Sequence, residues 1–192
     1  MAAAILDAAA GVLADRGDQA SMSDVATAAG VARATLYRYF PSRDALLDAL
    51  GRFALDETSE LLRGARLDQV AVDEGLLRAV RALVTVGDAF VVLARERGRP
   101  DPQAFESSVA APVRGLLARG QSLGDIRDDV PTSWLAEALF SLVVSVAGSG
   151  SGLGAEDTIS TIASVFFDGA RRRDGTAPAP VTTINTEGND DA

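Results

Sequence analysis

The sequence contains no cysteine and no histidine. It therefore cannot form a disulfide, offer a thiolate or an imidazole to catalysis, or bind zinc through the usual Cys and His ligands. Helical-bundle metal sites built on Glu-x-x-His pairs are excluded for the same reason. We expect no bound metal, no cofactor and no enzymatic activity from this chain.

Long apolar runs are also missing. A membrane span needs about 18 apolar residues free of charge, and no such stretch is present. Acidic residues interrupt the apolar stretch 1–17, and no basic leader precedes it. We therefore expect neither a membrane partner nor a signal peptide. The absence of cysteine fits a reducing compartment, so we expect a cytoplasmic protein.

The charge of the chain is predominantly negative, with a net value of −9, and every basic residue is an arginine. Residues 1–52 carry five arginines and six aspartates, whereas the rest of the chain carries 13 arginines and 21 acidic residues. Three of the early arginines fall between positions 33 and 43. A nucleic-acid-binding surface needs a local basic patch rather than a basic chain, so this cluster keeps that function open.

Apolar residues recur at helical spacing along the chain, and no segment alternates as a strand would. The pattern predicts an all-α fold, with helices over 3–14, 22–29, 32–39, 42–63, 73–87, 88–97, 102–121, 131–148 and 156–172. Ser21 and Asp24 have the S-x-x-D spacing of a capping box, and Ser42 is placed to cap the helix after Pro41. Gly17 is suited to a left-handed helix end.

The stretch GVARATLYRYF, residues 30–40, concentrates arginine and tyrosine in one short helix. At 100° per residue, Leu36 and Phe40 share the face that should enter the core, while Ala34 and Arg38 point away from it. The outward face would then present guanidinium, phenol and hydroxyl groups, which donate hydrogen bonds to phosphate oxygens and base edges.

The preceding helix and the tight turn at Gly30 complete a helix-turn-helix plan. Arg33 and Tyr39 are expected toward the inner edges of the second helix. The periodicity leaves an alternative open, namely an ordinary three-helix cluster in which the aromatic residues serve as packing.

Residues 21–47, SMSDVATAAGVARATLYRYFPSRDALL, closely resemble the DNA-binding segment of the TetR/AcrR family of transcriptional repressors. The string GV-x-x-x-TLY-x-YF is the most specific part of the match. The resemblance implies a three-helix DNA-binding domain over 1–45 and a helical effector-binding and dimerisation domain over 46–173. Residues 174–192 are polar, contain prolines and end acidic, which predicts a disordered tail.

The function implied by the resemblance is that of a dimeric repressor. It would bind a pseudo-palindromic operator of double-stranded DNA and be released by a small, mostly apolar effector. The alternative is a helical, dimeric interaction protein that has no DNA-binding activity.

The same resemblance assigns DNA-contacting roles to eight residues. Four match base-reading positions: Arg33, Ala34, Thr35 and Arg38. The others match positions that contact the DNA backbone, or in the case of the serine the backbone or a base: Ser23, Tyr37, Tyr39 and Arg43. Ala32 replaces the serine usual in the family, so the recognition helix is expected to lack its side-chain cap, a loss of about 0.5–2 kcal/mol.

The two C-terminal helices are apolar on most of their surface, which favours packing inside on one face and against a second subunit on the other. Core packing alone is the alternative. The resemblance implies a homodimer through these helices, with candidate interface residues Leu135, Leu139, Leu142, Val143, Val146, Ile159, Ile162 and Phe166. It also implies an effector pocket among the middle helices, with candidate lining residues Phe90, Leu93, Phe105, Val109, Leu116 and Trp134.

Overall fold

The computed structural model describes residues 1–95, 101–149 and 154–172 of the chain. The elements are, in chain order, α1 (Ala2–Arg16), the 3-10 turn η1 (Gly17–Gln19), α2 (Met22–Ala28), α3 (Arg33–Tyr39), α4 (Arg43–Ala65), α5 (Val72–Thr85), α6 (Gly87–Arg95), α7 (Pro102–Phe105), the π-helical segment η2 (Glu106–Ala110), α8 (Ala111–Leu123), α9 (Thr132–Ala147) and α10 (Ala155–Ala170). These ranges contain no strand beyond an isolated bridge between Ile126 and Arg171. The predicted all-α fold is confirmed, and the predicted tail lies outside the described residues.

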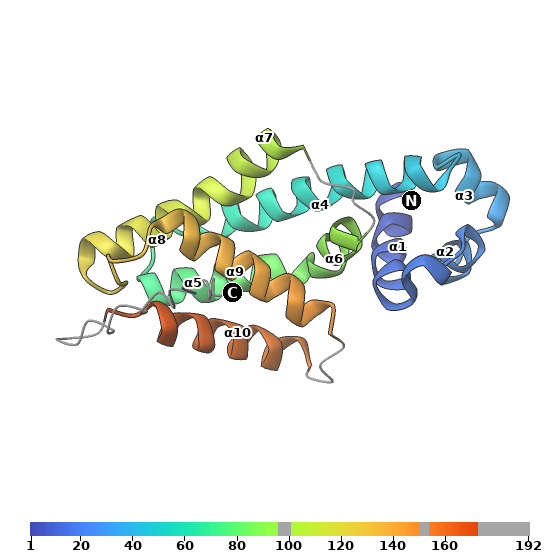
Figure 1. Cartoon of the computed structure of the whole chain (residues 1–192). Coiled ribbons are helices and arrows are strands. Elements are labelled where there is room, and N and C mark those ends of the chain that lie inside the picture. Colours follow the sequence, from blue (N-terminus) through green and yellow to red (C-terminus); the bar gives the residue numbers. More distant parts are fainter. Residues whose placement is uncertain (96–100, 150–153, 173–192) are drawn as a thin grey trace, which may run out of the picture.

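The molecule is elongated, with α1, α2 and α3 forming a small unit at one end (Figure 1). The long helix α4 leaves this unit and extends along the larger helical part. In that part α9 and α10 run antiparallel to each other, and α5 packs beside α10. Within the described ranges, no helix combines the length and the apolarity needed to cross a bilayer.

Local capping signals explain where the N-terminal helices begin. The Ser21 hydroxyl accepts from the Asp24 amide at 3.2 Å, and the Asp24 carboxylate accepts from the Ser21 amide at 2.8 Å, which confirms the capping box. The Ser42 hydroxyl caps α4 by accepting from the Ala45 amide at 3.1 Å. Gly17 ends α1 with the positive φ of 56° that favours glycine, as predicted, but its ψ of −132° lies outside the left-handed α region.

The predicted helix 102–121 is divided in the structure. Its middle widens into η2, directly before Pro112 in the first turn of α8. A proline has no N–H to donate to the carbonyl four residues earlier, and its ring crowds that carbonyl, so the regular α-helical ladder is interrupted there.

The molecule has two apolar cores, and the boundary between them falls within α4. The first core takes Leu46, Leu50 and Ala54 from α4, while the second takes Leu55 and Leu62. The predicted domain boundary at 45–46 lies earlier in the chain than this change of core. One uninterrupted helix contributes to both cores, so the sequence has no break where the cores meet. Helix α6 also belongs to the first core, through Ala89, Val92 and Leu93, and packs on α1.

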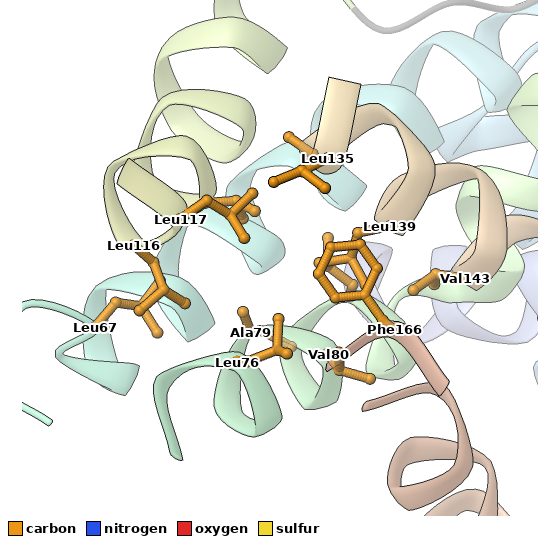
Figure 2. Close-up of a cluster of buried hydrophobic side chains, with 14 of the residues drawn as sticks. Leu67, Leu76, Ala79, Val80, Leu116, Leu117, Leu135, Leu139, Val143 and Phe166 are labelled. Carbon is orange, nitrogen blue, oxygen red and sulfur yellow. The ribbon is translucent and has the colours of Figure 1, made fainter. Parts of the chain in front are cut away.

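The second core is assembled from the middle and C-terminal helices (Figure 2). Leucine and valine side chains of α5, α8 and α9 converge there with Phe166 of α10. Close approach depends on small residues: a Cβ added at Gly120 would lie 2.7 Å from Ile126 Cδ1. This core holds α9 and α10 against the rest of the chain.

Candidate nucleic-acid interface

The turn between α2 and α3 has the geometry of a helix-turn-helix. Gly30 adopts φ 65°, a left-handed conformation that glycine accepts without strain. The Val31 amide then donates to the Ala26 carbonyl at 3.0 Å, which closes the turn. Helix α3 begins at Arg33 with Ala32 as its N-cap, and no side chain caps it, as predicted.

Helix α3 divides into a buried and an exposed side, largely as its periodicity predicts. Leu36 and Phe40 lie in the first core. Tyr37 is 36% exposed and Tyr39 is 41% exposed. The position predicted for Tyr39 at the inner edge is therefore wrong.

The other predicted α3 contacts also lie at or near the surface. Arg33, Ala34 and Arg38 are exposed, and Thr35 is half-buried. Arg33, like Tyr39, had been expected closer to the core. The helix is only two turns long, and Leu36 is its one buried residue, so its other side chains keep contact with solvent.

Each arginine of α3 lies over a tyrosine ring of the same helix. The Arg33 guanidinium carbon is 5.4 Å from the centre of the Tyr37 ring, and that of Arg38 is 5.5 Å from the Tyr39 ring. Cation–π contact orients a guanidinium without using its N–H donors. Within the described part of the chain, neither of these arginines has an ion pair with an acidic residue. The face of α3 thus presents oriented cationic donors.

The remaining two predicted DNA-contacting residues lie beside this face. Ser23 is half-buried in the first turn of α2. Arg43 is also half-buried, and its Nη1 donates to the Ala20 carbonyl at 2.7 Å. This bond fastens the start of α4 to the loop before α2. Its role toward a phosphate stays a prediction, because at least one donor already has a partner within the chain.

The acid within α2, Asp24, is held by local donors. Asp24 accepts from Ser21, and Arg16 donates to it at 3.1 Å. The hydrogen bonds from Ser21, with a smaller contribution from Arg16, lower the pKa of the Asp24 carboxyl. Its negative charge is thereby committed to the N-terminus of α2.

Among the described residues, the predicted effector residues are spread over both cores and the surface. Val109 and Leu116 are buried in the second core, whereas Leu93 is buried in the first core, where it faces Gly51. Trp134 is 74% exposed at the start of α9, so its assignment to a pocket is wrong. The adjacent Leu135 occupies the inward position instead.

Phe90 and Phe105 do come together. Their ring centres are 6.2 Å apart in an edge-to-face arrangement. Phe140 of α9, which the periodicity did not single out, lies 5.4 Å from Phe105. These three rings connect α6, α7 and α9, and so connect both cores.

Most of the predicted dimer contacts lie inside the single chain. Six are buried in the second core: Leu135, Leu139, Val143, Ile159, Ile162 and Phe166. Their side chains have little surface left for a second subunit, so their assignment to an interface is wrong. Leu142 and Val146 are half-buried and keep part of their surface. The outward sides of α9 and α10 instead carry Trp134 and Val165, which is 59% exposed.

Two arginine features were missed by reasoning from the sequence. Arg95 joins α6 to the ends of α1 and α9 through main-chain oxygens. Arg63, Arg66 and Arg119 line one hollow between α4 and α8. The i, i+3 spacing of Arg63 and Arg66 was a local signal for the second feature, whereas the approach of Arg119 depends on tertiary packing. In the described ranges, no group of three or more acidic residues is placed to hold a metal ion.

Comparison with known proteins agrees with this geometry. The family described as "Bacterial regulatory proteins, tetR family" matches residues 5–50, which cover α1 to α3 and the start of α4. The HTH-type transcriptional repressor LfrR of Mycolicibacterium smegmatis is 43% identical over 84 residues, 44% of each chain, so this match spans under half of that repressor's length. MT1294 of Mycobacterium tuberculosis, an uncharacterised HTH-type transcriptional regulator, is 34% identical over 158 residues and 73% of each chain.

A solved structure extends the similarity to the whole fold. The TetR-like regulator LfrR from Mycobacterium smegmatis in complex with proflavine has a TM-score of 0.69 and 27% identity, covering 91% of this chain and 97% of that one. The likeness therefore includes the second core and the C-terminal helices as well as the helix-turn-helix unit.

Proposed function

Since the chain belongs to the TetR family of bacterial regulatory proteins, we propose that it is a dimeric transcriptional repressor. It acts in the cytoplasm, binds a pseudo-palindromic operator through α2 and α3, and is released by a small effector. The observation that carries this proposal is the outward face of α3, where Arg33 and Arg38 are exposed and oriented by tyrosine rings.

The geometry supports two different roles for the side chains at this interface, base reading and phosphate binding. Arg38 and Arg33 have the donors needed for bidentate contact with guanine O6 and N7 in the major groove. The Tyr37 and Tyr39 hydroxyls and the Ser23 hydroxyl suit phosphate oxygens. Leu36 anchors the helix in the first core, so the reading face is held rigidly.

A dimer is supported by the outward sides of α9 and α10. Trp134, Ala138, Ser141 and Ser145 recur at helical spacing on the exposed side of α9. Aromatic residues are enriched at protein interfaces, so the large exposed ring of Trp134 supports association through this side of α9. Two subunits joined here would each present one α3 to a half-site, at spacings of about 34–36 Å or a multiple.

The route from effector to DNA is supported by α6. This helix packs on α1 in the first core, while its Phe90 ring contacts Phe105 of α7. An effector that shifts α7 relative to α9 would move α6 and hence α1. Such an effector releases DNA only if it binds the two arrangements with different affinity.

A direct test is a fluorescence-anisotropy titration with duplexes from the region upstream of the chain's own gene. We expect a dimer-sized complex whose association constant falls linearly with salt on logarithmic axes. Absence of any salt-sensitive complex would favour the interaction protein without DNA binding.

A further inference from the structure

A hollow of about 570 Å³ opens between the last turns of α4 and the η2–α8 helix. This volume lies in the range of about 300–1,000 Å³ that small-molecule sites occupy. The buried side chains of Leu62, Leu67 and Leu116 form its apolar part, and three arginines form its polar part. We call it the α4–α8 groove.

The charge of the groove is opposite to that of the part of the chain around it. Arg63, Arg66 and Arg119 line it together with a single acid, Asp68. From residue 53 onward, by contrast, the chain has 21 acidic residues and 13 arginines. Three arginines that line one hollow create a local positive site that suits an anion.

Two of these arginines are held in place by contacts that leave most of their donors unused. Arg119 Nη2 donates to the Leu67 carbonyl at 2.6 Å, and Arg63 Nη2 donates to the Ser59 hydroxyl at 3.3 Å. A guanidinium has five N–H donors, so both retain donors for a ligand. Among the described residues, the Arg66 guanidinium has no hydrogen-bonding or ion-pair partner.

The backbone conformation of Arg66 is a second, independent observation that singles out this groove. Arg66 caps α4 with φ 49° and ψ 53°, in the left-handed region, and it is the described non-glycine residue with positive φ. Glycine is the usual residue at such a helix end because it carries no Cβ penalty. An arginine at this position adopts a strained backbone conformation, and the same residue lines the groove.

The opposite wall of the groove is irregular as well. Ser107 and Ser108, both in the π-helical segment η2, line it and add hydroxyl groups near the arginines. Single π-helical turns inside α-helices occur frequently at functional sites. Both walls therefore depart from regular helix at the groove.

We propose that the α4–α8 groove binds an amphiphilic anion. Its carboxylate or phosphate head would be held by Arg66, Arg63 and Arg119, and its aliphatic part would lie along Leu62, Leu67 and Leu116. The role of this anion as the effector rests on the repressor function proposed above, whereas its binding does not.

The test is calorimetric titration of the whole protein with decanoate and decyl phosphate, below the concentrations at which they form micelles. Decyltrimethylammonium and decanol serve as probes of opposite and of no charge. We expect both anions to bind, and the tighter of the two identifies the head group. If decanol or decyltrimethylammonium bound with the same heat and affinity as the two anions, the proposal would be overturned.

Three variants locate the site. Arg66→Gln should weaken anion binding by about 10- to 100-fold, the equivalent of one charge-assisted contact. Arg52→Gln, also exposed on α4 but outside the groove, should leave it unchanged. Gly115→Leu should abolish binding, since a Cβ there meets no atom within 4 Å and the side chain would fill the groove without displacing the core.

Anion binding to Arg66→Gln and Gly115→Leu with the parent's affinity would refute the assignment. Operator binding of the same proteins, measured separately, distinguishes the two proposals. A protein that binds DNA but no anion keeps its proposed function and loses the groove. If the protein binds the anion but no DNA, the groove stands as an anion site and the repressor function is rejected.

Discussion

The Arg95 guanidinium donates a hydrogen bond of 2.6 Å to the main-chain oxygen of Ala14. Arg95 is the last residue of α6, and Ala14 lies in the last turn of α1. The same side chain donates to the Gly148 carbonyl at the end of α9, at 3.2 Å. One arginine therefore joins the DNA-binding unit to the helix proposed for dimerisation, and it compensates unpaired carbonyls at two helix C-termini.

Replacing Arg95 should uncouple these parts. In Arg95→Met the aliphatic stem is kept but both hydrogen bonds are lost, and we expect a loss of about 1 kcal/mol in the free energy of unfolding. Operator affinity without effector should change little, whereas the reduction of that affinity by effector should shrink. Urea titrations and anisotropy with and without effector measure the two quantities. An unchanged effector response would show that this contact carries no signal.

Arg38 and Tyr37 should separate base reading from backbone binding. Arg38→Gln should reduce the difference between matched and mismatched operators by about 1–3 kcal/mol, because a bidentate contact to a base is lost. Tyr37→Phe should weaken binding to all duplexes by a similar factor, about 1 kcal/mol, because one hydroxyl is lost. Competition assays with single-base operator variants measure both, and Arg52→Gln is the control. An Arg38→Gln protein with the parent's discrimination would reject the base-reading role.

Trp134 should report on the dimer. Trp134→Glu places a charge where a subunit is expected to bury the ring, so we expect the dimer to weaken by at least about 30-fold, corresponding to a hot spot of 2 kcal/mol. Sedimentation velocity across a concentration series measures this, with the exposed α8 variant Ala118→Glu as the control. If Trp134→Glu and the parent dimerise equally, the interface lies elsewhere.

The capping box should make α2 sensitive to acid. The pKa of Asp24 is lowered in the folded protein by its hydrogen bonds to Ser21 and by Arg16. A depressed pKa means that the carboxylate stabilises the fold above its ordinary pKa, and that this contribution is lost as pH falls through the folded value. Asp24→Ala should therefore lower the melting temperature at pH 7, and the difference from the parent should shrink toward pH 2. A melting-temperature difference that stays constant from pH 7 to pH 2 would contradict this account.

The helix-turn-helix unit could be predicted because its determinants are local. Ser21 and Asp24 stand three residues apart, and the burial of Leu36 and Phe40 follows from helical spacing within one short helix. The C-terminal half could not be predicted to the same depth. Helix α9 is apolar on most of its surface, so its own sequence does not say that Leu135 turns inward and Trp134 outward. That choice is made by packing against α5, α6 and α8, and the first two of these helices are distant from α9 in the sequence. The Arg95–Ala14 contact spans 81 positions and leaves no local pattern.

Because α4 is one unbroken rod of 23 residues, it works mechanically as a lever between the two cores. At a rise of 1.5 Å per residue its length is about 35 Å, so a tilt of about 3° at one end displaces the other by about 2 Å. In a two-fold dimer, both subunits would undergo this displacement of the α4 end, so the separation of the two α3 helices would change by the combined amount. Small angular adjustments near the groove would thus be amplified into a mismatch with the pitch of the double helix.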